Sequence, residues 1–430
     1  MNRRSFLHRF STGTAGLVVG SAAFAAATAK ARAALPERAG MGPEALAKDE
    51  TFWREVSTWW APAPDFINLE YGYYHAAALP TLEVELRKAR YINTRNSRYK
   101  RTEATEDQEA ARVALAAAVG ADTEEVAIVR NATEALDALI LGIHLSAGDE
   151  IVHGDQDYGS MVEAMEQRVA RDGVVMKMAS IPVHPKNDEE VVAAYAAMMT
   201  PRTKVLLVTG LINITGHLLP VRKICDMAHA AGAVVIVDAA HSIGLVDIPI
   251  RDWDCDYLGT SLHKWMCSPL GLGMLYAKKG GVDKVWPFFG RTRVAKDNIR
   301  KFDQIGTRPE SAHVGLLEAI RVHQAIGPAN KLARMRYLHG RWVEALKDVP
   351  RVVINTPLDP RRYASVGNVG IAGVKGGDLA NYWMEKHNIF TAGIGHAKVP
   401  GVRVTPGVPT PVEHIDRLVE AMHAALKHFA

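Results

Sequence analysis

Two neighbouring stretches, VVIVDAAHSIG (residues 234–244) and DYLGTSLHKWMCSPLGLGMLY (residues 256–276), decide the fold of this chain. The apolar run at 234–237 has the length and branching of a buried strand, and it ends on an acidic residue, Asp238. A mostly apolar run at 257–262 leads to Lys264, and a third run follows at 272–277. Because burying a lone charge is costly, we expect Asp238 and Lys264 at the mouth of a sheet.

Helices and strands alternate along the chain before this region. Apolar runs predict strands at residues 125–130, 149–154, 174–180, 204–210 and 233–238. Amphipathic stretches predict helices at residues 103–120, 133–145, 159–173, 188–199 and 221–232. Short apolar strands separated by helices predict an α/β fold with a doubly wound, mostly parallel sheet. Ligands of such sheets bind at the carboxyl ends of the strands.

The alternation stops after about residue 280. Residues 316–348 have the pattern of one long helix, and a smaller α+β section follows and ends in an amphipathic helix at 411–429. The segment at 34–85 fits neither pattern, and we expect it to pack against the C-terminal part. We therefore predict a signal peptide (1–33), an N-terminal segment of a small domain (34–90), a large domain (91–310) and the rest of the small domain (311–430).

The first 33 residues have the organisation of an export signal. Arg3 and Arg4, followed by Phe6 and Leu7, resemble the twin-arginine signal, and a weakly apolar stretch rich in Gly, Ala, Ser and Thr follows. The small-x-small sequence at 31–33 is a cleavage site. A membrane anchor is the alternative, but the stretch is short for a span. We expect a periplasmic or secreted protein that does not span the membrane after cleavage.

The basic balance of the chain belongs to this signal. The formal net charge is +4, and the signal holds five basic residues and no acidic one, which leaves the mature chain at −1. The basic residues of the signal are Arg3, Arg4, Arg9, Lys30 and Arg32. No basic surface for nucleic acid is predicted.

Polar residues follow several predicted strands and can converge at one edge of the sheet. Asn131 and Thr133 open a helix, whose free N–H groups suit a phosphate, although by themselves they indicate only a helix cap. Tyr158 begins another helix and can stack on a flat ring, or simply lie at the surface. Asp238 can cap a helix, bind a metal or pair with a protonated pyridine, and metal is the weakest choice because only His241 lies at ligand spacing.

Lys264 has three interpretations. It can be a surface lysine whose stem lies on apolar neighbours. Ser261-x-x-Lys264 also spells the serine–lysine motif of penicillin-binding hydrolases, but the S-D-N and K-T-G motifs of that class do not occur in the chain. A desolvated lysine has a lowered pKa and becomes an amine nucleophile, which makes it a covalent anchor for a cofactor.

Together these residues match what pyridoxal 5′-phosphate (PLP) requires. A helix start binds the phosphate, an aromatic ring stacks on the pyridine, an aspartate holds its nitrogen and a lysine forms the Schiff base. The chain also resembles the class V aminotransferases, which are fold-type I PLP enzymes and include cysteine desulfurases and isopenicillin N epimerases. The resemblance extends from FINLEYGYYHAA (66–77) to VRVTPGVPTPVEHIDRLVEAM (402–422).

The resemblance implies roles for individual residues. Lys264 corresponds to the Schiff-base lysine, Asp238 to the partner of the pyridine nitrogen and His241 to the residue near the phenolic oxygen. It implies cofactor contacts at Asn131, Ala132, Thr133, Tyr158, Asn213, Ser261 and His263. Gly306 and Thr307 correspond to a segment that reaches the phosphate of a second subunit, so a homodimer is implied. Arg403 corresponds to the arginine that pairs with the substrate carboxylate.

The resemblance is closest to the isopenicillin N epimerase-like branch. The loop that carries the nucleophilic cysteine in desulfurases is GIGHAKVPGVRV (393–404) here, with His396 and no cysteine, so a persulfide route is disfavoured. The three cysteines, Cys225, Cys255 and Cys267, are expected to be buried.

The implied substrate is an amino acid or amino-acid-like group, activated at Cα through an aldimine and a quinonoid. Epimerisation, transamination, C–S lyase chemistry and oxidative deamination or decarboxylation all remain open, the last as in exported enzymes that tailor siderophores such as pyoverdine. A non-catalytic cofactor-binding protein is a further alternative, which retention of the whole residue set disfavours. A second proton donor is expected among Tyr71, Tyr73, His75 and His396.

Overall fold

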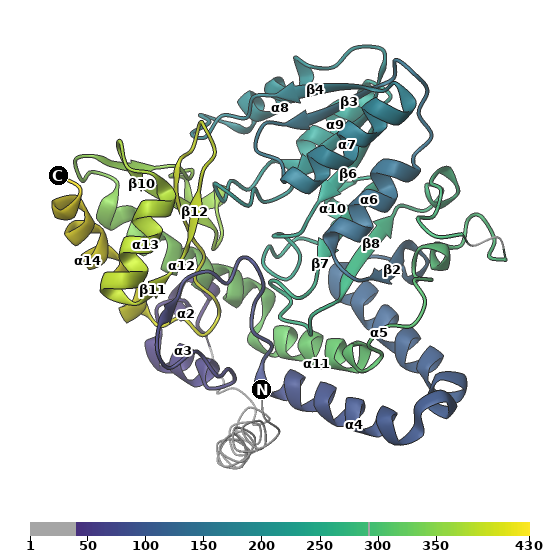
Figure 1. The fold of residues 1–430 in the computed structure, drawn as a ribbon, viewed down its shortest axis with the longest axis horizontal. Coiled ribbons are helices and arrows are strands. Elements are labelled where there is room, and N and C mark those ends of the chain that lie inside the picture. The colour runs from purple at the N-terminus through teal and green to yellow at the C-terminus, as the bar shows by residue number, and fades with distance from the viewer. Residues whose placement is uncertain (1–39, 291–292) are drawn as a thin grey trace, which may run out of the picture.

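The computed structural model describes residues 40–290 and 293–430, so the predicted signal peptide lies outside the described residues. The described chain forms a large body around one sheet and a smaller body that contains the C-terminus (Figure 1). No helix in the described ranges is both long and apolar enough to cross a bilayer.

The large sheet has seven strands in the order β2-β8-β7-β6-β5-β3-β4. Its strands are β2 (Val126–Val129), β3 (Glu150–Gly154), β4 (Val175–Ala179), β5 (Thr203–Thr209), β6 (Val234–Asp238), β7 (Tyr257–Ser261) and β8 (Gly273–Ala277). Only β8 runs against its neighbours β2 and β7, so the sheet is mostly parallel. The predicted α/β class is correct, and the carboxyl ends of β2, β3, β5, β6 and β7 share one edge.

Helices cover both faces of this sheet because successive side chains of each strand point to opposite faces. In β6, Val235 and Val237 pack on the face with α5 (Ala104–Val119), α8 (Asp188–Ala196), α9 (Val221–Ala230) and α10 (Ile250–Trp253), whereas Ile236 packs on the other face. That second face carries α6 (Ala132–Gly142) and α7 (Gly159–Asp172). Two of the predicted helices end at a glycine with a positive φ, α5 at Gly120 and α7 at Gly173.

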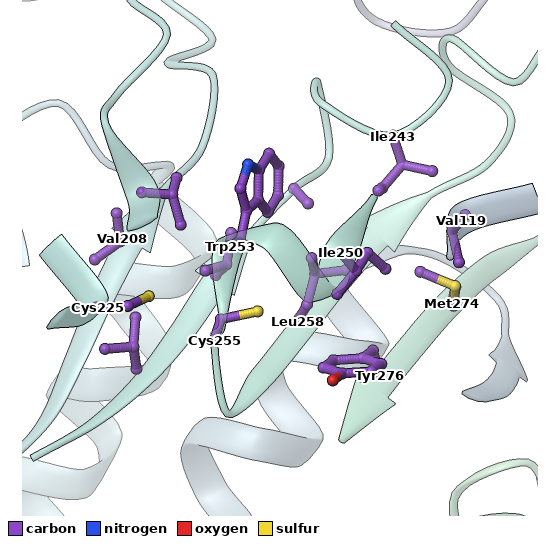
Figure 2. Packing of buried hydrophobic residues seen from close by; sticks show 14 of the residues in the cluster. Val119, Val208, Cys225, Ile243, Ile250, Trp253, Cys255, Leu258, Met274 and Tyr276 are labelled. Carbon is purple, nitrogen blue, oxygen red and sulfur yellow. The ribbon is translucent and has the colours of Figure 1, made fainter. Parts of the chain in front are cut away.

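The apolar core on the face of the large sheet that carries α5, α8, α9 and α10 contains two of the three cysteines. Cys225 and Cys255 lie among apolar residues that include Trp253 and Leu258 (Figure 2). Cys267 is buried in another cluster, and all three thiols are free. The prediction that each cysteine is a small buried residue is therefore confirmed.

The small body is built from both ends of the described chain. Near its start, β1 (Ile67–Asn68) pairs in parallel with β11 (Ile389–Phe390). A second sheet has the order β12-β13-β10-β9, made of β12 (Ala392–Ile394), β13 (Gly401–Val404), β10 (Gly367–Ile371) and β9 (Val352–Ile354). Its helices are α2 (Pro43–Leu46), α3 (Glu50–Ser57), α12 (Pro328–Leu346), α13 (Gly376–His387) and α14 (Val412–His428).

The single helix predicted at 316–348 is two helices. Gly327 adopts a φ of 88° and Pro328 follows it, which ends α11 (Ser311–Ile326) before α12 begins. The two helices belong to different bodies. α11 packs on α4 (Leu79–Thr102) and α5, whereas α12 packs on α14. α11 and α12 thus pack in different bodies on either side of residue 327, and the predicted boundary at residue 310 stays a prediction.

Short 3₁₀ turns complete the described elements. They are η1 (Thr123–Glu125), η2 (Val282–Lys284), η3 (Ile299–Phe302) and η4 (Pro360–Arg362).

Candidate active site

A cavity of about 290 Å³ lies at the carboxyl edge of the large sheet, where the small body meets it. Residues predicted from the strand ends and from the resemblance line it. They are Asn131, Ala132, Thr133, Tyr158, Asn213, Asp238, His241, Ser261, His263, Lys264, Arg403 and Tyr73. The sheet rule for ligand position therefore located this cavity.

The start of α6 forms one end of the cavity. Asn131 caps the helix by accepting a hydrogen bond from the N–H of Glu134 at 2.8 Å, and the N–H of Ala132 donates to Oγ of Ser261 at 2.9 Å. Ser261 ends β7, so this bond joins the strand that leads to Lys264 to the helix start. Nearby, Nδ1 of His263 is buried and has no partner among the described residues. The N–H groups of Ala132 and Glu134 are already engaged here, and it is the positive dipole end of α6 that suits a phosphate.

Lys264 lines the cavity, and its surroundings favour the neutral amine more than water does. Its Nζ atom lies 3.0 Å from Nε2 of His241. The indole N–H of Trp265, which can only donate, points at Nδ1 of His241 at 3.3 Å. The ring proton of a neutral His241 is therefore on Nε2, and it is donated to Nζ. Burial, opposed in part by Asp238, lowers the pKa of Lys264 to about 8.

Two carboxylates lie at this edge of the sheet, the buried Asp238 in the cavity wall and the partly buried Asp157 outside it. Asp238 ends β6, is 4% exposed and accepts one bond, at 2.9 Å, from the N–H of Ala240. Burial raises the pKa of Asp238. Asp157 accepts bonds from the hydroxyl of Thr209 at 2.7 Å and the N–H of Gly154 at 2.8 Å, and burial raises its pKa to about 7. Sequence reasoning missed Asp157 and Thr209, although both stand at strand ends.

Arg403, on β13, comes from the small body and is already paired. Its Nε donates to Oε2 of Glu70 at 3.2 Å, and its Nη2 forms an ion pair with Oε1 of the same side chain. Nη1 donates to the carbonyl of Asn213 at 3.3 Å. Glu70 was not predicted, and an acid inside the apolar segment 66–71 was the one signal that could have pointed to it.

Several predicted residues lie away from the cavity. His75 is buried, packs against Tyr71 with ring centroids 4.5 Å apart, and accepts from the N–H of Val408 at 3.1 Å. His396 donates to the carbonyl of Asp155 at 3.0 Å. Of the four candidate proton donors, only Tyr73 lines the cavity.

Gly306 and Thr307 are also absent from the cavity wall. Thr307 instead lines a separate surface hollow beside α4. Their predicted contact with a second subunit stays a prediction.

The residues around the cavity fit PLP. The unpartnered Nδ1 of His263 and the start of α6 match a phosphate, and the amine of Lys264, whose pKa is lowered, matches an aldehyde. Asp238 uses one oxygen within the described residues, which leaves the other for a protonated ring nitrogen. Tyr158, 44% exposed at the rim, supplies a ring beside the same space. No cysteine lines the cavity wall that the structure describes.

Comparison with known proteins finds relatives of the kind that the sequence resemblance implies. The family model described as aminotransferase class-V matches residues 80–412. The isopenicillin N epimerase of Streptomyces clavuligerus is 28% identical, over 73% of this chain and 83% of the relative. That of Amycolatopsis lactamdurans is 31% identical, over 58% of this chain and 67% of the relative. A probable cysteine desulfurase of Synechocystis is 27% identical, over 76% of this chain and 82% of the relative.

Solved structures agree with the fold. A cystine C–S lyase in complex with cysteine persulfide superposes with a TM-score of 0.75 at 21% identity, covering 83% of this chain and 97% of the lyase. The cysteine desulfurase CsdA of Escherichia coli gives 0.75 at 21%, covering 88% and 98%. The predicted fold-type I architecture is confirmed.

Proposed function

Because the chain belongs to the class V aminotransferase family and is a PLP-dependent enzyme, we propose that it exchanges a proton at Cα of an amino acid or amino-acid-like group, as an epimerase does. The observation that carries the proposal is the amine of Lys264, held 3.0 Å from His241 in the cavity that also contains Asp238 and the start of α6.

The residues of this chain divide the work as follows. When bound, PLP withdraws electrons from the Cα atom of an amine joined to it. Lys264 would hold the cofactor, and its free amine would take the Cα proton as a general base. Asp238 would keep a proton on the ring nitrogen, and the start of α6 would bind the phosphate. His241 holds its own proton at Nε2 and donates it toward the centre of the cavity.

Epimerisation requires a second group that returns the proton to the opposite face of Cα. Tyr73 lines the cavity and is 67% exposed, and it is our candidate for this group. The persulfide route of desulfurases is disfavoured because Cys267 is buried outside the cavity wall and the loop at 395–400 has no cysteine. Transamination, C–S lysis and oxidative chemistry on a siderophore precursor are the alternatives that the experiment must separate.

The test is to incubate the PLP-loaded protein with a panel of L-amino acids in D₂O. Deuterium at Cα together with the D-isomer, and no keto acid, supports epimerisation. Keto acid without sulfide and without oxygen uptake indicates transamination, sulfide together with pyruvate indicates C–S lysis, and oxygen uptake indicates oxidation. Lys264→Ala is the control, and full turnover by this variant would overturn the proposal.

We also propose that the enzyme is exported by the twin-arginine route, on the sequence of residues 1–33, and that it works as a homodimer. Replacing Arg3 and Arg4 by lysine should leave the precursor in the cytoplasm, which cell fractionation detects. Light scattering on the mature protein should give twice the chain mass, and a monomeric mass would contradict the dimer.

A further inference from the structure

The arginine that faces the candidate substrate space is neutralised by a glutamate from the other end of the chain. Glu70 and Arg403 are 7% and 8% exposed, and two nitrogens of the guanidinium engage the two carboxylate oxygens. This is the bidentate arrangement that an arginine makes with the carboxylate of a bound ligand. Glu70 therefore occupies the side of Arg403 on which a substrate carboxylate would pair most strongly.

The backbone fixes Glu70 in this position. Residues 70 and 405 form a parallel bridge, in which the N–H of Thr405 donates to the carbonyl of Leu69 at 2.7 Å and the N–H of Tyr71 donates to the carbonyl of Thr405 at 3.1 Å. The hydroxyl of Thr405 also lies 3.3 Å from Oε2 of Glu70. The pair is thus part of the junction between the first and last segments of the small body, and it is formed before any substrate arrives.

Little of the guanidinium remains for a second anion. It has five N–H groups, and Glu70 and the carbonyl of Asn213 engage three of them. The two that remain can donate to a neutral carbonyl oxygen. An added carboxylate would share one positive charge with Glu70 in a buried site, and like charges that close together disfavour each other.

The effect reaches the reacting amine. Arg403 lowers and Glu70 raises the pKa of Lys264, so their charges act there in opposite directions. Arg403 can thus still donate hydrogen bonds into the cavity, but it attracts anions less strongly than an arginine without an acidic partner would.

We propose that Glu70 makes this site select an amine whose neighbouring carboxyl group is neutral, as in an amide, over an amine that carries a free α-carboxylate. The proposal rests on the proposed function and narrows its substrate class to capped or conjugated amino acids. Specificity of this kind arises by placing a repulsive group against the unwanted ligand.

The test compares L-alanine with L-alaninamide on the PLP-loaded protein, by titrating each against the visible absorption band of the bound cofactor. The measured quantity is the ratio of the two dissociation constants, and its change between variants cancels the different basicity of the two amines. In Glu70→Gln, which keeps an acceptor for Arg403 but removes the charge, we expect the ratio to shift at least tenfold toward alanine.

Two variants serve as controls. Glu70→Asp retains the charge and should retain the preference for the amide, which separates charge from misfolding. Glu413→Gln removes a carboxylate from the exposed ion pair with Arg54 and should leave the ratio unchanged.

The outcomes separate the two proposals. If wild-type protein binds alanine as tightly as alaninamide and Glu70→Gln leaves the ratio unchanged, the selectivity proposal is overturned while the proposed function stands. If neither ligand perturbs the band in any variant, and no L-amino acid or its amide in the panel does so, the proposed function itself fails.

Discussion

The Nζ atom of Lys264 accepts a hydrogen bond from Nε2 of His241, 3.0 Å away, because the indole of Trp265 donates to the other nitrogen of that ring. Three side chains meet here: the histidine that follows β6, the lysine that follows β7, and the tryptophan next to the lysine. Trp265 is fully buried in the core of the small body. The packing of one body therefore sets the protonation state of the amine at the edge of the other.

This arrangement predicts how fast the apoprotein takes up PLP at different pH values. Burial lowers the pKa of Lys264 to about 8, so the nucleophilic neutral amine grows as pH rises through about 8. We expect half-maximal uptake rate near this pH, measured between pH 6 and 10 by borohydride trapping and mass spectrometry. Asp238→Asn removes a charge that raises this pKa and should move the midpoint lower. A midpoint above about 9.5, near that of an ordinary lysine, would contradict the geometry.

A second prediction concerns Gly273 in β8. A Cβ atom there would lie 2.6 Å from Cα of Asn131 and 2.7 Å from its backbone N and C, so Gly273→Ala must displace the start of α6. Because that helix start is the phosphate end of the cavity, we expect PLP affinity to fall by roughly tenfold or more, measured by equilibrium dialysis. Gly377→Ala is the matched control, since nothing lies within 4 Å of its Cβ. Unchanged affinity in Gly273→Ala would place the phosphate elsewhere.

Tyr73 provides the test of the second proton donor. In Tyr73→Phe we expect formation of the D-isomer to fall by roughly a hundredfold, as for loss of a general acid. Deuterium exchange at Cα with retention of configuration should continue, because Lys264 serves the other face. NMR and chiral chromatography measure the two rates. An equal loss of both rates would show that Tyr73 orients the substrate instead.

A contact between the two bodies lies outside the cavity wall. Lys398 forms an ion pair with Asp155 and donates to Oγ of Ser180 at 2.7 Å, while His396 donates to the carbonyl of Asp155. Lys398 is half exposed, so the pair contributes only about 0.5–1 kcal/mol. We expect Lys398→Ala to accelerate amide hydrogen exchange in residues 395–400 by roughly two- to fivefold. Exchange that does not change would mean that His396 alone holds the loop.

Buried histidines predict the acid limit of stability. Burial is the main cause that lowers the pKa of His75, His323 and His339 to about 3 and of His217 and His313 to about 4. Below about pH 6.5 the unfolded chain binds protons that the folded chain excludes. The contribution of these histidines to the free energy of unfolding should therefore be unchanged above pH 6.5 and should fall below it, by up to about 1.4 kcal/mol per pH unit for each histidine.

Urea unfolding of the apoprotein between pH 7 and pH 5 measures this slope. His339→Gln, which removes a ring stacked on Tyr363 at 4.1 Å, should make the slope shallower even though it lowers stability overall. His423→Gln changes an exposed histidine and should leave the slope as it is. A slope that His339→Gln leaves unchanged would show that other groups control acid unfolding.

The sequence predicted those parts of the structure that follow from local pattern. Apolar runs and glycine ends placed the strands and helices of the large body, and the rule for strand ends brought Asp238 and Lys264 together. The break at Gly327 and Pro328 was also a local signal, but the strong helical periodicity on both sides outweighed it.

Contacts between distant segments could not be read in this way. Glu70 and Arg403 are 333 residues apart, and neither neighbourhood contains a pattern that names the other. The loops that carry His75 and His396 were predicted to be near the site, but the direction of their side chains depends on packing against Tyr71 and on the carbonyl of Asp155. These side-chain directions depend on tertiary contacts, which leave no periodic pattern in the sequence.

The distance along the chain between Glu70 and Arg403 also affects the order in which parts of the protein fold during synthesis. A ribosome adds about 5–20 residues per second, so Glu70 emerges roughly 15–70 s before Arg403 exists to receive it. The strands of the large sheet are translated within that interval and can pair while the first segment still waits. The junction of the two chain ends, and with it the cavity wall that Arg403 completes, is therefore among the last parts of the protein to form, and a chain truncated before β13 would have a finished sheet but an unfinished site.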